Sequence, residues 1–303
     1  MELAAITFHQ IFMMVLLLGL GLLCAKAGII DAHTNKKLSA LLTKVVTPAV
    51  VIVSFQRPME AQLLRGLGMS ALMSLMAFAI MIPLSHLLFQ KKQGEGYAIE
   101  RFAAVYSNCG FIGIPLVNGV FGMEGVFYLS AFIALFNLLA FTHGAMTMQG
   151  GFNRRLLAKA ACSPAVLGVL FGFFLFWSGI SLPEIILAPL GLVGNLNTPL
   201  AMLVGGASML GMDALGMLQN KRLFYICFWR LAAFPILLLG VFHLVPAPQM
   251  ITGTVLIAAS APVAATLMML SYEYGRDTLY ASELFTASTL LSMATLPLLM
   301  LFL

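Results

Sequence analysis

Charged side chains are scarce in this chain of 303 residues. Only 9% of the residues are Asp, Glu, Lys or Arg, whereas 61% are hydrophobic. A soluble domain has about 25% charged residues, because its surface must face water. The composition therefore excludes a soluble globular domain and predicts an all-α integral membrane protein. The lipid bilayer is the first partner that it implies, and no nucleic-acid partner is expected.

Cysteine and acidic residues are also sparse. The four cysteines, Cys24, Cys109, Cys162 and Cys227, are scattered and have no C-x-x-C spacing. We expect buried thiols rather than disulfides or a metal site. No Asp or Glu falls in the middle of a predicted membrane span, although proton relays in membranes usually need such a group. The chain has no P-loop or dinucleotide motif, and no cofactor is expected.

Long apolar runs take up most of the sequence. A membrane-crossing helix needs about 20 apolar residues, and this criterion predicts ten membrane helices. Pro246 and Pro248 mark a tight turn between the eighth and the ninth. The predicted helices cover residues 4–25, 38–56, 66–89, 98–120, 123–148, 163–180, 191–212, 222–244, 249–272 and 283–303.

The distribution of basic residues predicts the orientation of these helices. With the N-terminus outside, every Lys and Arg except Arg57 and Arg65 falls in inner loops and flanks. Cytoplasmic loops carry the excess of Lys and Arg. We therefore expect both termini on the outer, periplasmic side of a bacterial inner membrane.

The second half of the chain repeats features of the first. Gly28 and Gly179 have the same spacing as Pro48 and Pro199. Each half has five predicted helices, an odd number, so the second would be inserted upside down. The sequence thus predicts two inverted five-helix repeats, residues 1–150 and 151–303, a design found in many secondary transporters.

The most informative stretch, residues 106–122, reads Y-S-N-C-G-F-I-G-I-P-L-V-N-G-V-F-G inside an apolar span. Proline lacks an N–H and clashes with the preceding turn of a helix. We therefore predict a break in the fourth helix at Gly113 and Pro115, and a matching break in the ninth at Ala261 and Pro262. Broken membrane helices are the usual way in which transporters build a binding site.

If the two breaks cross near the middle of the bilayer, the new helix N-termini favour an anion there. The sequence therefore predicts a binding site for a small organic anion. The candidate substrate-binding residues are Asn108, Cys109, Gly110, Pro115, Asn137, Ser260, Pro262 and Thr266.

Other polar residues suggest supporting roles or different functions. Arg230 lies inside the eighth helix within snorkelling reach of the inner surface, which makes it a candidate attractor for entering anions. His86 and His143 lie near the inner boundary, where we interpret them as interfacial residues. Ser208, in G-A-S-M, loosely suggests an intramembrane serine hydrolase, although no His has an obvious place as its base. A channel is a further alternative.

Three motifs carry a resemblance to a known family. They are S-N-C-G-F-I-G-I-P-L (107–116), N-T-P-L-A-M (197–202), and the tail Y-E-Y-G-R-D (272–277) with A-S-E-L-F-T-A-S-T-L-L-S-M-A-T-L-P (281–297). Together they resemble the auxin efflux carrier family, which includes the plant auxin exporters and compact bacterial carriers. Where many relatives have an Asn after the ninth-helix proline, this chain has Thr266.

The resemblance implies ten helices with crossing breaks in the fourth and ninth. It implies a homodimer whose scaffold helices 1, 2, 6 and 7 stay still, while helices 3–5 and 8–10 carry substrate in an elevator-type movement. It also implies substrates such as auxin or the dicarboxylate malonate. The alternative transport function is that of a cation-coupled symporter of the bile acid:sodium symporter type.

Overall fold

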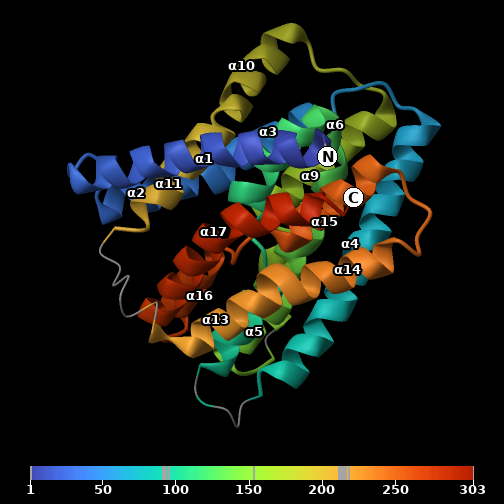
Figure 1. Cartoon of the computed structure of the whole chain (residues 1–303). Helices are drawn as coiled ribbons and strands as arrows, with labels where there is room; N and C mark the ends of the chain where they lie inside the picture. The colour runs from blue at the N-terminus through green and yellow to red at the C-terminus, as the bar shows by residue number, and fades with distance from the viewer. Residues whose placement is uncertain are drawn as a thin grey trace.

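The computed structural model describes residues 2–90, 94, 96–152, 154–210, 217 and 219–302 (Figure 1). Over these residues the fold is helical, apart from loops and one isolated antiparallel bridge between Ser107 and Val263. The fold is therefore that of an all-helical membrane protein, as the composition predicted.

Helices fill both halves of the chain. The first half contains α1 (Glu2–Lys26), α2 (Ala32–Leu41), η1 (Leu42–Val46), α3 (Thr47–Ser54), α4 (Ala61–Leu88), α5 (Tyr97–Val105), η3 (Cys109–Gly113), α6 (Ile114–Leu139), η4 (Ala140–Gly144) and α7 (Ala145–Gln149). The second half contains α8 (Arg154–Ala161), α9 (Pro164–Ser178), α10 (Glu184–Asn195), α11 (Asn197–Ala207), α13 (Lys221–Phe228), η5 (Trp229–Ala233), α14 (Phe234–Phe242), α15 (Gln249–Ser260), α16 (Thr266–Glu273) and α17 (Thr278–Met300).

Seven helical stretches in the described residues are long and apolar enough to cross a membrane, and α9 and α15 are shorter apolar helices. The longest stretch, Cys109–Gln149, has 41 residues. At 1.5 Å per residue it would measure about 60 Å, twice the ~30 Å hydrocarbon core. Gly122 divides it, because its backbone there is non-helical (φ 65°, ψ −165°). This is where the sequence predicted the boundary between the fourth and fifth helices.

Several predicted helices begin too late, because the apolar criterion misses polar first turns. The second predicted helix starts at residue 38, but α2 starts at Ala32, where the Asp31 carboxylate accepts a hydrogen bond from the Thr34 N–H (2.7 Å). This backbone hydrogen bond lowers the pKa of the Asp31 carboxyl. Asp277 caps α17 in the same way, so the tenth helix starts before residue 283. A cap fixes the start of a helix irrespective of hydropathy.

The seventh and third predicted helices also begin too late. The stretch α10–α11 covers Glu184–Ala207 and α4 covers Ala61–Leu88. The end of the predicted range 191–212 falls partly outside the described residues.

The expectation of buried thiols is correct for Cys109 and Cys227 and wrong for Cys162, which lies exposed in the turn after α8.

Three prolines in this fold follow π-helical turns. Three of the π-helical turns, η1, η3 and η5, lead directly into helices whose second residue is Pro48, Pro115 or Pro235. A π-turn widens the helix by one residue and is common at functional sites. A proline at the start of the next segment removes an N–H that has no partner there. The helices thus continue through these prolines instead of breaking.

The helices fall into two groups according to their contacts (Figure 1). In the α1 group, α1 packs along α11, and α3 packs against α9 and α10. In the α6 group, α6 packs against α4 and α15, and α17 packs against α16 and α13. We use these names below for the sets α1–α3, α9–α11 and α4–α7, α13–α17, with their π-turns.

Hydrogen bonds hold each group together. Asn35 donates to Ser208 (2.9 Å) inside the α1 group, where the Leu182 N–H also donates to Gln56 (2.8 Å). Inside the α6 group, Arg222 forms a bidentate ion pair with Glu100 at 2.6 and 2.8 Å. These bonds join segments that are distant in the sequence, so each group is cross-linked within itself.

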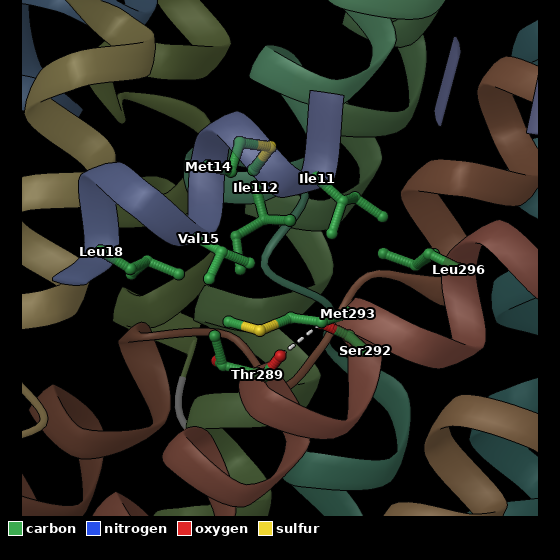
Figure 2. A pocket seen from close by; sticks show the side chains of 9 residues that line it. All are labelled: Ile11, Met14, Val15, Leu18, Ile112, Thr289, Ser292, Met293 and Leu296. Carbon is green, nitrogen blue, oxygen red and sulfur yellow. Dashed lines mark hydrogen bonds between the residues drawn. The ribbon is translucent and has the colours of Figure 1, made fainter. Parts of the chain in front are cut away.

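Apolar side chains dominate the contact between the groups. Figure 2 shows one part of it, a cavity of about 20 Å³ between α1, η3 and α17. Val15 and Met14 of α1 face Met293 of α17 there, with Ile112 of η3 between them. Phe55 packs on Phe127 across the same boundary, with ring centroids 5.0 Å apart. An ion pair, Arg57–Glu124 at 3.9 Å, also crosses it.

Glycines allow α1 and α11 to approach closely. A Cβ atom added at Gly206 would lie 2.0 Å from the Leu18 carbonyl oxygen, and one at Gly21 would lie 2.4 Å from the Leu203 oxygen. Small residues permit such backbone approach in membranes, where van der Waals packing drives helix association. The α1–α11 pair is therefore packed backbone against backbone.

We expect Gly206→Ala to lower the melting temperature, because the two backbones must separate to admit the methyl group. Overpacking of this kind costs ~1–3 kcal/mol. Gly191→Ala is the matched control, since a Cβ there has no atom within 4 Å, and alanine favours a helix over glycine. Thermal unfolding of the purified protein in detergent measures both. Equal melting temperatures for the two variants would contradict the close approach.

Candidate functional site

The two broken helices meet at their non-helical segments. α5 ends at Val105 and is followed by Tyr106–Asn108, while α15 ends at Ser260 and is followed by residues 261–265. The Asn108 N–H donates to the Pro262 carbonyl (2.7 Å), and the Ala264 N–H donates to the Tyr106 carbonyl (3.0 Å). The unwound segments therefore pair as a short antiparallel ladder, which satisfies backbone groups that lipid could not.

The first break lies earlier than Gly113 and Pro115. Gly113 belongs to η3 and Pro115 to the first turn of α6, and the chain is helical through both. The prediction of a break at these residues was wrong, because the π-turn η3 comes just before Pro115 and the helix continues through the proline. Asn108 ends the break instead, since its side-chain oxygen accepts from the Phe111 N–H (3.4 Å) and caps η3. In the ninth predicted helix, Ala261 and Pro262 lie in the non-helical segment.

Arg230, in η5, holds both breaks. Its side chain is fully buried, with 0% exposure. Nε donates to the Ala261 carbonyl (3.0 Å), Nη2 to Ala259 (2.5 Å) and Ala261 (2.7 Å), and Nη1 to Ala104 (3.1 Å) and Val105 (3.2 Å). A guanidinium has five N–H donors, so each has a carbonyl.

This geometry corrects the role predicted for Arg230. It does not snorkel to the inner surface, and its donors face protein carbonyls rather than an entering anion. The carbonyls belong to the last residues of α5 and α15 and to the unwound residue after α15. Such carbonyls have no intrahelical partner, and the helix C-terminus carries about half a negative charge. Arg230 therefore caps two helices at once.

Several predicted substrate residues come together at this crossing. Asn108, Cys109 and Gly110 lie at the start of η3, while Ser260, Pro262 and Thr266 surround the second break. Asn137 is different, because its amide donates to the Ile133 carbonyl (2.8 Å) one turn back in α6. The Asn137 amide is therefore hydrogen-bonded to the backbone of its own helix.

Unpartnered polar groups remain beside the crossing. Within the described residues, the buried hydroxyls of Ser260 and Thr266 have no hydrogen-bond partner, and the same is true of both amide atoms of Asn197. Asn197 begins α11, which packs against η3. A Cβ atom added at Gly110 would meet nothing within 4 Å. The start of η3 thus borders open space, and buried donors nearby are available to a ligand.

A hydrogen-bonded chain leads from the first break to a larger cavity. The Tyr106 hydroxyl lies 2.8 Å from His143 Nδ1, and His143 Nε2 lies 3.0 Å from His86 Nε2. Both histidines and Arg101 line a cavity of about 530 Å³ that also reaches Thr147 and Gly150. The sequence suggested interfacial histidines but gave no sign that they contact each other, because they lie far apart in the chain.

The hydrogen bonds fix the protonation of this chain. The Tyr106 hydroxyl donates its one proton to the Leu139 carbonyl (3.0 Å). The hydroxyl oxygen therefore accepts the hydrogen bond from His143, and it is His143 Nδ1 that carries the proton. In neutral His143, Nε2 is then a bare acceptor, and the His86 Nε2–H donates to it. An imidazole–imidazole hydrogen bond requires at least one neutral ring.

The hydrolase alternative finds no support at Ser208. Its hydroxyl donates to the Val204 carbonyl (2.9 Å) and accepts from the Asn35 amide (2.9 Å). A serine nucleophile needs an adjacent base, and both partners here are structural. Ser208 therefore joins α2 to α11.

Acidification should loosen the His86–His143 pair. Two protonated rings in contact would repel each other in the folded protein, whereas the unfolded chain takes up these protons freely. Stability present at about pH 8 is therefore lost as the pH falls below about 6.5, the usual pKa of a histidine in an unfolded chain. We expect a fall in melting temperature that is smaller in His86→Ala. His243→Ala is the control, because that exposed ring bonds, among the described residues, the carbonyl of Leu239 in its own helix. An equal pH response in wild type and His86→Ala would contradict the paired geometry.

Comparison with known proteins agrees with this architecture. A family model described as membrane transport protein matches residues 6–300. An uncharacterized transporter of Methanothermobacter thermautotrophicus is 23% identical over 295 residues, which cover 92% of each chain. The match extends across both broken helices and both helix groups. The chain therefore belongs to the membrane transport protein family, that of the auxin efflux carriers, and is a multi-pass integral membrane protein.

Proposed function

We propose that this chain is a bacterial inner-membrane carrier for small organic anions, namely carboxylates such as dicarboxylates or auxin-like acids. The paired breaks at Tyr106–Asn108 and 261–265 carry this proposal. Discontinuous helices that meet inside the membrane form the substrate sites of many secondary transporters. A continuous helix bundle would need no such backbone pairing.

The chemistry of the crossing favours an anion. η3–α6 and α16 both begin there, at Cys109 and Thr266. The first N–H groups of a helix lack intrahelical partners and carry a partial positive charge. The unpartnered hydroxyls of Ser260 and Thr266 add hydrogen-bond donors, and Arg230 already caps the opposing C-termini. The groups left for a ligand are therefore mainly donors, which suits a carboxylate.

Inverted repeats with ten crossings are part of the proposal. Gly28 and Gly179 both adopt positive φ, 73° and 67°, at the ends of α1 and α9. The residues after them, Ile29 and Ile180, donate in the same way to Cys24 and Leu175. Equivalent local structures at equivalent sequence spacing support a duplication.

Elevator-type movement is the proposed mechanism, with the α1 group as scaffold and the α6 group as the moving body. The hydrogen bonds within each group and the apolar boundary between them support this division. Apolar contact is non-directional and can be replaced by similar contact after a shift. We also propose that the scaffold forms a homodimer, as in the family resemblance.

Asn108→Ala should weaken carboxylate binding by about tenfold, the equivalent of one hydrogen bond to a charged group. A thermal-shift screen of the purified protein against carboxylates, including malonate and auxin, identifies the ligand by its stabilisation of the folded state. Asn118→Ala is the control, because Asn118 is exposed on α6. Unchanged affinity in Asn108→Ala removes Asn108 from the site, and saturable counterflow in proteoliposomes separates a carrier from a channel.

A cross-link between the groups should stop transport if they slide. We expect a Val15→Cys/Met293→Cys pair, which lines the cavity in Figure 2, to block uptake when cross-linked and to recover on reduction. The four native cysteines are replaced first. Asn35→Cys/Ser208→Cys is the matched control within the scaffold, where the native side chains lie 2.9 Å apart. Full activity of the cross-linked first pair would rule out movement along this boundary.

A further inference from the structure

Arg230 binds the kind of backbone group that holds a cation in transporters with broken helices. In such carriers, unwound backbone carbonyls and half-helix C-terminal ends coordinate the coupling ion. Here the carbonyls of Ala104, Val105, Ala259 and Ala261 have this arrangement, two from each broken helix. All four accept hydrogen bonds from the guanidinium of Arg230.

The charge at this position is balanced without a carboxylate. Two helix C-termini carry together roughly one negative charge, which matches the single positive charge of the guanidinium. Of the carboxylates in the described residues, Glu100 lies in α5 but is paired with Arg222 at 2.6 Å. The carbonyl cluster and the guanidinium therefore form a complementary unit.

Arg230 also excludes a second cation. Its side chain has 0% exposure, so it fills the space between the carbonyls. An alkali ion bound to the same oxygens would lie within a few Å of the guanidinium, in a low-dielectric interior where like charges repel strongly. Unlike an ion, this cation is covalently attached and remains through every transport cycle.

We propose that Arg230 is a built-in cation at the site where a coupling sodium ion would otherwise bind, so that this protein works without an alkali cation. The claim that the protein works without an alkali cation rests on the proposed carrier function. The claim that Arg230 occupies a cation site does not. It predicts that the crossing in the wild-type protein is stable whichever cation is present.

Thermal unfolding of the purified full-length protein tests the site. With sodium chloride replaced by choline chloride at constant ionic strength, the wild-type melting temperature should not change. Arg230→Ala should melt at a lower temperature and regain stability with millimolar guanidinium or with sodium, because a cation that binds only the folded state stabilises it. Arg276→Ala is the control, since Arg276 donates to the single carbonyl of Met148. It should not respond to sodium.

Two results would overturn the proposal. One is a wild-type melting temperature that rises with sodium, and the other is an Arg230→Ala variant that unfolds like wild type and ignores both cations. If Arg230→Ala does not fold, the wild-type salt comparison decides the question, with Arg230→Lys as the variant that keeps the charge.

Uptake of radiolabelled malonate and auxin into proteoliposomes separates this inference from the proposed function. Equal uptake in sodium and choline supports both. Uptake that requires sodium overturns the inference and leaves the carrier function intact. No uptake in either salt contradicts the carrier function for these substrates, and the melting temperatures then still decide whether Arg230 occupies a cation site.

Discussion

The crossing depends on the five hydrogen bonds that Arg230 donates to backbone carbonyls. Two helices end inside an apolar protein, and their last carbonyls cannot reach water. Leaving such groups unpaired in lipid costs several kcal/mol each. A buried charge is equally unfavourable when alone, and breaking a buried charged pair costs about 3–5 kcal/mol. In this fold the two unfavourable groups stabilise each other. Arg230 donates hydrogen bonds to the carbonyls of Ala104 and Ala259, and the partial negative charge of these carbonyls stabilises the guanidinium.

Further backbone groups of the crossing are satisfied locally. The Asn108 and Ala264 N–H groups donate to the carbonyls of the opposite unwound segment, and the Val263 N–H donates to the Ser288 hydroxyl (3.0 Å). The helix N-termini are what is left, with Asn108 capping only one of them. The site is therefore asymmetric in chemistry, since Arg230 bonds the C-terminal carbonyls while the Ser260 and Thr266 hydroxyls have no partner and remain able to donate to a ligand.

The sequence predicted the class of fold and the position of one of the two helix breaks, because both depend on local composition. Apolar length predicted ten membrane helices, and the described residues contain seven stretches long enough to cross a membrane and two shorter apolar helices. Pro262 lies in one of the two breaks. Pro115 misled the prediction, because a proline after a π-turn leaves the helix intact, and no local pattern distinguishes the two cases. Arg230 was noticed as a lone charge in an apolar helix, but its partners lie 29–31 and 125–126 residues away in the chain. Contacts at such separation depend on tertiary packing, which one sequence does not reveal.

The different kinds of contact within and between the helix groups have a mechanical consequence. Hydrogen bonds such as Arg222–Glu100 are directional, and they weaken steeply when the donor–acceptor distance or angle changes. Dispersion contacts between apolar side chains, such as those around the cavity between α1, η3 and α17, are individually small and can re-form in a new register. A displacement of the α6 group would therefore keep Arg230 and both breaks together as one body. The crossing is rigid because its hydrogen bonds are directional, and the largely apolar boundary around it is compatible with the proposed movement of the α6 group.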